Sequence, residues 1–209
     1  GNTMPKKAKA FQEKGCVVVK NFVPKQTAKM LFSYLVCSSV SKKLLNPNIK
    51  LEGDEQVPGS LSAVHGDTIF ESLLFSLREK MELNTGLSLL PTYSYRRLYT
   101  HGNILHKHKD RPSCEISATI KLSDNSEYNW PIWMQDTAIE LEDGDALLYR
   151  GCDLEHWREP CGGSKKYLMG QTFLHYIDVN GPFTDSAFDK NEIRQKAYDN
   201  FLNYCSQLD

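Results

Sequence analysis

The stretch from Tyr99 to Asp110 reads YTHGNILHKHKD and ends in the pattern His108-x-Asp110. Residues i and i+2 of a β-strand point to the same side. The imidazole of His108 and the carboxylate of Asp110 can therefore reach one metal ion together. The pattern predicts a metal site if a further ligand comes from elsewhere in the chain.

The candidate for that ligand is His156. It follows a predicted strand at 146–150 and precedes a predicted long strand at 166–179. Two histidines and one carboxylate on one face of an ion leave cis positions open, which is typical of non-haem Fe(II) oxygenases. His101 and His106 lie beside His108, but neither has an aspartate two residues further on, so neither is predicted to be a ligand.

The hydrophobic pattern around this site indicates a β-rich fold. Residues 114–122 alternate between apolar and polar side chains, and several short strands with turn signals between them suggest a sandwich or barrel. Helical patterns precede this region, at 28–35 and 68–81, and another follows at 186–208. The fold class is therefore mainly β (α+β), with helices first, an antiparallel β core, and a C-terminal helix.

The whole chain, 1–209, is interpreted as a single domain with three parts. They are an N-terminal strand and helices (1–88), a β core (89–180) and a C-terminal helical segment (181–209). Residues 46–66 lack periodicity and are rich in proline and glycine, which predicts a long loop outside the core. This loop is either a mobile lid over a site or a surface loop without a role.

Composition excludes several classes of protein. The net charge is −1, so there is no basic excess to meet the phosphates of a nucleic acid or a membrane surface. No apolar run is long enough for a membrane span, and no secretory signal is expected. The six cysteines form no C-x-x-C pair, which predicts reduced thiols and a cytoplasmic location.

The spacing around the predicted ligands resembles that of a known family. Residues 99–110 fit Y-x-x-G-x-x-L-x-x-H-x-D, and Lys166 lies ten residues after His156. Both features resemble the prolyl 4-hydroxylase-like branch of the 2-oxoglutarate/Fe(II)-dependent dioxygenase superfamily, over roughly residues 90–176. The resemblance implies a double-stranded β-helix, or cupin-like jelly roll, with N-terminal helices packed on its larger sheet.

The resemblance also implies a reaction and its cofactors. Fe(II) would be held by His108, Asp110 and His156, and 2-oxoglutarate would be decarboxylated to succinate while a substrate is hydroxylated. Lys166 would bind the far carboxylate of 2-oxoglutarate inside the barrel, with Lys165 on the opposite face. Ascorbate is a candidate reductant. The partners are 2-oxoglutarate, dioxygen and a peptidyl or small-molecule substrate, with a peptidyl residue such as proline as one candidate.

Further residues are assigned to the site more loosely. Tyr99, Thr119 and Thr172 are candidates for contacts with 2-oxoglutarate, and Arg97, Trp157 and Arg158 for contacts with substrate. Each has an alternative as a packed or surface side chain. His175 is expected to face outward, since it is out of phase with Lys166 along the predicted strand.

Two other functions remain open at this point. One is a cupin-type metalloenzyme of another reaction class, although cupin ligand sets are usually richer in histidine. The other is a catalytically idle jelly roll that binds a metal or senses a ligand. Loss of a triad member would indicate such a module, and all three are present.

Overall fold

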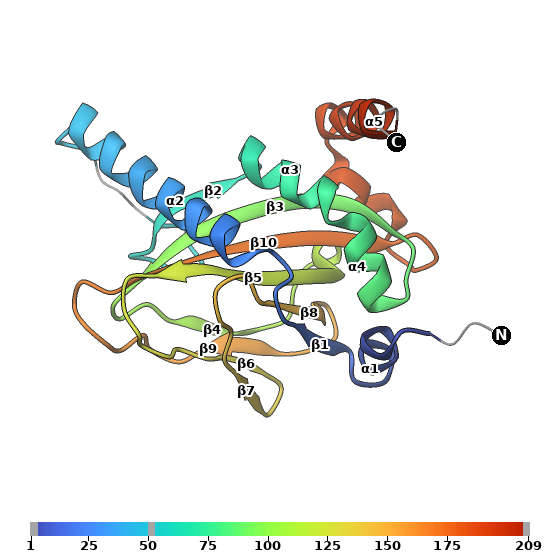
Figure 1. Cartoon of the computed structure of the whole chain (residues 1–209), viewed down its shortest axis with the longest axis horizontal. Coiled ribbons are helices and arrows are strands. Elements are labelled where there is room, and N and C mark those ends of the chain that lie inside the picture. Colours follow the sequence, from blue (N-terminus) through green and yellow to red (C-terminus); the bar gives the residue numbers. More distant parts are fainter. Residues whose placement is uncertain (1–3, 50–52, 207–209) are drawn as a thin grey trace.

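The computed structural model describes residues 4–49 and 53–206, which form two antiparallel β-sheets covered on one side by helices (Figure 1). The helices are α1 (Lys6–Lys14), α2 (Lys25–Leu45), α3 (Thr68–Ser76), α4 (Arg78–Thr85) and α5 (Glu192–Ser206), with 3-10 turns at Pro112–Cys114 and Thr184–Lys190. The strands are β1 (Cys16–Val19), β2 (Leu61–His65), β3 (Leu89–Thr100), β4 (Leu105–His108), β5 (Ile116–Asp124), β6 (Ile132–Met134), β7 (Thr137–Ile139), β8 (Ala146–Arg150), β9 (His156–Arg158) and β10 (Leu168–Asp178).

The chain winds between the two sheets. The larger sheet has the order β1-β8-β5-β10-β3-β2 and the smaller one the order β4-β9-β6-β7. From β3 onward the chain alternates between them, with β3, β5, β8 and β10 in the larger sheet. This is the winding of a double-stranded β-helix. The predicted α+β jelly roll, with N-terminal helices on the larger sheet and a C-terminal helix, is confirmed.

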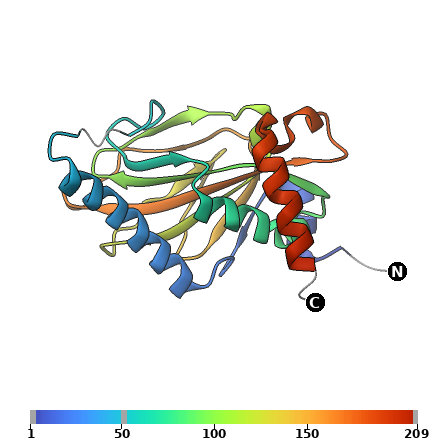
Figure 2. The ribbon, with the colours of Figure 1, turned by 90° about the horizontal axis from the view of Figure 1, so that it is seen from above.

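Helices α2 and α3 lie across the outer face of the larger sheet (Figure 2). Leu31 and Leu35 of α2, at i and i+4, pack with Phe70 of α3 against Leu98 of β3 and Leu122 of β5. Each buried leucine contributes roughly 1.5–3 kcal/mol to stability. This apolar contact commits one face of the sheet to the helices and leaves the other face to line the barrel.

The alternation of β5 decides which side chains enter the barrel. Ile116, Ala118 and Ile120 are fully buried in the core beneath the helices, as the pattern predicted. Ser117 points the other way and lies 2.7 Å from Nδ1 of His175 on β10. The predicted alternation begins only at residue 116, because Cys114 belongs to a 3-10 turn.

The prediction that 46–66 forms a loop outside the core is wrong in two respects. Leu61–His65 forms the edge strand β2 of the larger sheet, paired with β3. Val57 is fully buried in a cluster with Tyr99 and Leu105. A single apolar residue among prolines and glycines has no periodicity, so its burial left no signal in the sequence. Residues 50–52 of this segment lie outside the described residues.

The helix predicted from Thr68 to Met81 is two helices that break at Leu77. Its N-cap is Asp67, whose side chain accepts a hydrogen bond from the backbone N–H of Ile69 at 2.9 Å. The second helix ends at Gly86, whose φ of 75° is the left-handed conformation typical of a glycine C-cap.

The C-terminal helix starts at Glu192 rather than at 186, after the Thr184–Lys190 turn. The apolar side chains of this helix differ in burial. Tyr198 is buried, but Ile193 is 80% exposed. The predicted end at Leu208 lies outside the described residues. None of the helices in the described ranges combines the length and apolar character that a membrane crossing requires.

A buried ion pair anchors this helix to the rest of the fold. Nε of Arg194 donates to Glu71 of α3 at 2.5 Å, and the same carboxylate accepts from the backbone N–H and hydroxyl of Ser94 on β3. Removal of one member of a buried pair leaves the other charge uncompensated. We expect Glu71→Ala to lower the free energy of unfolding by about 3 kcal/mol, measured by urea denaturation.

The matched control is Glu79→Ala in α4. The Glu79 side chain is 87% exposed and lies 3.9 Å from Arg78, so its removal should change stability by less than about 0.5 kcal/mol. Equal stabilities of the two variants would show that the Glu71–Arg194 pair does not anchor the helix.

Candidate metal centre

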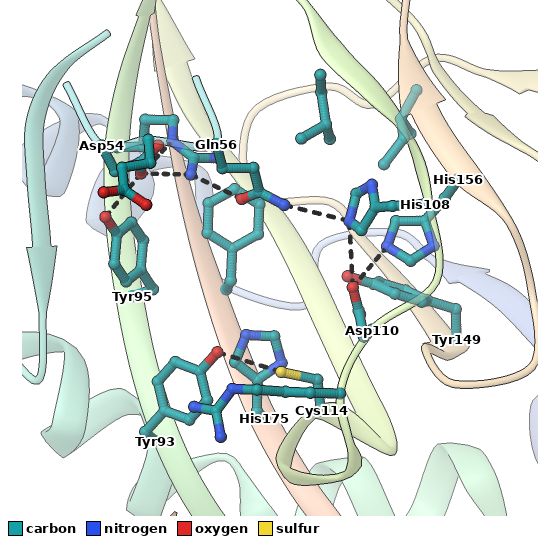
Figure 3. Close-up of a pocket in the computed structure, with 16 residues that line it drawn as sticks. Asp54, Gln56, Tyr93, Tyr95, His108, Asp110, Cys114, Tyr149, His156 and His175 are labelled. Carbon is teal, nitrogen blue, oxygen red and sulfur yellow. Dashed lines mark hydrogen bonds and ion pairs between the residues drawn. The ribbon is translucent and has the colours of Figure 1, made fainter. Parts of the chain in front are cut away.

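His108, Asp110 and His156 come together between two neighbouring strands of the smaller sheet. β4 ends at His108, β9 begins at His156, and these two residues are register partners. One ligand atom from each of the three residues lies within 4.8 Å of the others. The Asp110 Oδ1 atom is 3.2 Å from Nε2 of each histidine (Figure 3).

Backbone contacts hold both imidazoles in one orientation. Nδ1 of His108 lies 2.7 Å from the carbonyl oxygen of His106, and Nδ1 of His156 lies 2.8 Å from that of Leu154. A carbonyl oxygen only accepts, so each Nδ1 carries a proton and each Nε2 is directed at Asp110. Hydrogen bonds of this kind orient metal-ligating histidines in proteins.

The surroundings of the Asp110 carboxylate favour a bound cation. With neutral rings, both Nε2 atoms and Oδ1 are acceptors that face one another, and a cation between them satisfies all three. The Oδ2 atom is buried without a hydrogen-bond partner in the structure. Burial alone would raise the pKa of Asp110, but the contacts of its carboxylate with the His108 and His156 rings hold this pKa well below its usual range. The donor set therefore fits a divalent metal ion.

Gly151 lies against this carboxylate. Its carbonyl oxygen accepts a hydrogen bond from the backbone N–H of Asp110 at 2.8 Å, which fixes the loop after β4. A Cβ atom at this position would overlap both Oδ2 of Asp110 and the carbonyl oxygen of Cys114. Glycine is thus required for the carboxylate to take its position.

The three residues line a cavity of about 730 Å³ between the sheets. Its aromatic wall comes from the larger sheet and includes Tyr93, Tyr95 and Phe173. Two further lining residues, Asp54 and Gln56, come from the segment before β2. Figure 3 shows them opposite the histidines, with the Gln56 amide reaching across to His108.

Asp54 and Gln56 contact both sides of the cavity. Asp54 accepts hydrogen bonds from the Tyr95 hydroxyl at 2.6 Å and from Nη2 of Arg97 at 2.5 Å. Gln56 accepts from Arg97 at 3.0 Å, and its amide nitrogen lies 3.2 Å from Nε2 of His108. The segment thus bridges a buried cation and a candidate metal ligand.

Lys166 does not enter the barrel. It is exposed in the turn before β10, where its backbone N–H donates to Ser164 and its carbonyl accepts from Asn125. The prediction that its ammonium group lies inside the barrel is wrong. Lys165 is exposed in the same turn.

Two other predictions assigned the side chains of β10 to the wrong faces of the strand. A Cβ at Gly170 would contact Phe32 and Leu35 of α2, so the even-numbered residues of β10 face the helices. Thr172 accordingly donates its hydroxyl proton to the Tyr95 carbonyl on β3 rather than lining the cavity. His175, expected to face outward, lines the cavity, and burial lowers its pKa to about 4.

The remaining candidates occupy varied positions. Arg97 lines the cavity. Tyr99 is fully buried, and its hydroxyl oxygen accepts a hydrogen bond from Nη1 of Arg97 at 3.0 Å. Thr119 is buried beside Gln171. Trp157 stacks on Trp133 at 5.7 Å and is not among the cavity-lining residues. Arg158, predicted to contact substrate, is buried and is not among the cavity-lining residues.

Sequence reasoning missed several residues of the cavity. Tyr149 has its ring 4.8 Å from that of His156, and Asp54, Gln56 and Gly151 touch the site as described above. Tyr149 lies in a predicted strand, 146–150, that leads to the candidate ligand His156. The sequence did not show which face of that strand carries the Tyr149 side chain. Asp54 and Gln56 carried no signal, since they lie in a segment without periodicity.

Comparisons with known proteins bear on the fold. No family model matches the chain, and no curated protein matches it. Solved structures do match, beginning with a prolyl-4-hydroxylase from Pseudomonas putida, with a TM-score of 0.60, 14% identity, and coverage of 84% of this chain and 99% of that one.

Two other matches are described with 2-oxoglutarate. HygX from Streptomyces hygroscopicus, with nickel, 2-oxoglutarate and hygromycin B bound, gives a TM-score of 0.63 at 13% identity, covering 87% of this chain and 90% of HygX. The non-haem α-ketoglutarate-dependent carbocyclase SnoK of nogalamycin biosynthesis gives 0.61 at 14% identity, covering 93% of each chain. The chain has the jelly-roll fold of the 2-oxoglutarate/Fe(II)-dependent oxygenases.

Proposed function

We propose that this protein is an Fe(II)- and 2-oxoglutarate-dependent dioxygenase that hydroxylates an organic substrate. The observation that carries the proposal is the convergence of His108, Asp110 and His156 at the cavity, with ligand atoms within 4.8 Å of one another. Two imidazoles and one carboxylate with open positions suit non-haem Fe(II). When bound, the metal and the 2-oxoacid supply the activation of dioxygen, with release of succinate and carbon dioxide.

The protein's own side chains position the reactants and exclude water. The triad would hold the metal through two Nε2 atoms and the carboxylate, each oriented by a backbone contact. The aromatic wall of Tyr93, Tyr95 and Phe173 forms a largely apolar space beside it. Such a wall keeps water from the reacting groups and offers ring faces to a substrate.

The substrate that we propose to test first is a peptidyl residue such as proline, because the sequence pattern resembles that of prolyl hydroxylases. The test is succinate formation with Fe(II), 2-oxoglutarate and ascorbate as reductant, together with mass analysis of the candidate substrates. Structures with this fold include a hydroxylase and a carbocyclase, so the product and not succinate alone identifies the reaction. Metal binding without succinate formation under any condition would instead indicate an idle binding module.

We further propose that the segment 53–60 is a cover over the cavity. Asp54 holds it closed through Arg97 and Tyr95, and the contact between Gln56 and His108 must break before Nε2 binds a metal. Val57 and Ser60 are buried, so deletion of the segment would open the core. A point variant that releases the cover is therefore the better test.

We expect Asp54→Asn to uncouple the reaction. The amide keeps the shape of the carboxylate but loses the ion pair with Arg97, so closure over substrate becomes weaker. Succinate formation should continue while the ratio of product to succinate falls. An unchanged ratio, measured with the substrate that the product analysis identifies, would contradict the proposed cover.

A further inference from the structure

Four arginines have buried side chains in the described ranges, and three of them have a carboxylate partner. The pairs are Arg96–Asp67 at 2.9 Å, Arg97–Asp54 at 2.5 Å and Arg194–Glu71 at 2.5 Å. The fourth, Arg158, is 2% exposed. No carboxylate of the described residues forms an ion pair with it.

The contacts of Arg158 are all to neutral groups. Nη1 donates to the Trp130 carbonyl at 2.9 Å, and with the Gln171 amide oxygen turned toward it Nη2 donates at 3.1 Å. The guanidinium lies over the rings of Trp130 and Tyr99. The Nε atom is buried without a partner.

A buried guanidinium without a countercharge destabilises the folded protein unless an anion binds to it. A buried charge requires a countercharge, and an unmade hydrogen bond of a buried donor adds to the penalty. Desolvation accordingly lowers the pKa of Arg158, with a partial offset from Tyr99. Among the buried arginines, this is the one whose countercharge has to come from outside the described residues.

The position of Arg158 relates it to the metal centre. It follows His156 by two residues on β9, so both side chains enter the barrel from the same side, about 6.5 Å apart along the strand. Its register partner on β4 is Leu105, which lines the cavity. The recess beside it, next to Met169 and Gln171, measures only about 20 Å³, which is room for one water. Arg158 itself is not among the residues that line the larger cavity, so a ligand group that reaches the guanidinium has to come from that cavity past Leu105.

We propose that Arg158 binds the far carboxylate of 2-oxoglutarate, in place of Lys166. The inference rests on the proposed function. The 2-oxoacid end of the co-substrate would lie at the triad, and its far carboxylate would be held by the guanidinium, two residues along β9 from His156. The unpartnered Nε is the first donor to the carboxylate, and Gln171 holds the guanidinium in place. Arginine suits this role because its planar fork can bind both carboxylate oxygens.

The test compares two 2-oxoacids by calorimetry on the full chain loaded with Ni(II), which involves no turnover. One is 2-oxoglutarate, and the other is 2-oxopentanoate, which has the same chain length but no second carboxylate. In Arg158→Gln, the affinity for 2-oxoglutarate should fall by about 100-fold. The affinity for 2-oxopentanoate should stay within about threefold, because the metal end of the site is intact.

Two further variants keep the inference testable if Arg158→Gln folds poorly. Arg158→Lys keeps the charge but loses the fork, so 2-oxoglutarate should bind about tenfold more weakly, with 2-oxopentanoate unaffected. Lys166→Gln is the control and should bind both acids like the wild type.

The possible failures are distinguishable. If the nickel-loaded wild type binds neither acid, the proposed function fails and the inference fails with it. If the wild type prefers 2-oxoglutarate and both Arg158 variants keep that preference, the inference alone is overturned. Loss of the preference in Lys166→Gln, or in Arg97→Gln but not in the Arg158 variants, overturns it as well.

Discussion

Asp110→Ala is expected to abolish turnover and to weaken metal binding by at least about 100-fold. The carboxylate is the sole anionic member of the triad, and Oδ1 lies 3.2 Å from both Nε2 atoms. Loss of a group that merely orients a ligand already lowers metal affinity 10–100-fold, so loss of a ligand has the larger effect. Metal affinity is measured by calorimetry with Ni(II), and turnover by succinate formation.

The neighbouring residues offer controls for this variant. Lys109→Ala and His106→Ala change exposed side chains within four residues of Asp110 and should leave metal affinity within about twofold. The fold of Asp110→Ala should persist, because Oδ2 has no hydrogen-bond partner to lose. A wild-type metal affinity in Asp110→Ala, or a loss in His106→Ala, would show that the ligand set is different.

Gly151→Ala should be the most damaging substitution outside the triad. The added Cβ would overlap Oδ2 of Asp110 and the carbonyl oxygen of Cys114, so the carboxylate or the loop has to move. We expect metal affinity to fall about 10–100-fold, the range found when the support of a ligand is lost. Calorimetry with Ni(II) measures it, and thermal unfolding of the metal-free protein shows how far the fold is affected.

Cys152→Ala is the matched control, since it removes a side chain from the next residue without adding an atom near Asp110. Its metal affinity should equal that of the wild type. If Gly151→Ala also binds metal within about twofold of the wild type, the contact between Gly151 and the carboxylate does not position the ligand.

The convergence of the three candidate metal ligands could be predicted because their signal is local or follows the order of the strands. His108 and Asp110 are two residues apart, and His156 is the histidine between two predicted strands. The alternation from Ile116 to Ile120 likewise indicated a sheet with one face in the core. Patterns of this kind depend on the period of the backbone and not on its surroundings.

Lys166 shows where such reasoning fails. Its distance from His156 in sequence is right for the resemblance, but β10 begins only at Leu168 and its even-numbered residues face α2. Strand parity depends on the residue at which pairing starts, and a shift of one residue reverses every side chain. The same error exchanged the expected positions of Thr172 and His175.

The sequence by itself determined a mainly β fold with flanking helices and the three residues that converge on one point, because periodicity and short spacing are properties of the local chain. The jelly-roll class came from the resemblance in motif spacing. Only the tertiary structure decided what surrounds them. Asp54 meets Arg97 across 43 positions of the chain, a pairing that no local pattern encodes. Whether an arginine is paired depends on which carboxylates the whole fold brings near it. Arg97 has Asp54 as its partner and Arg158 has no carboxylate among the described residues, and this difference supports the proposal that Arg158 binds an anion.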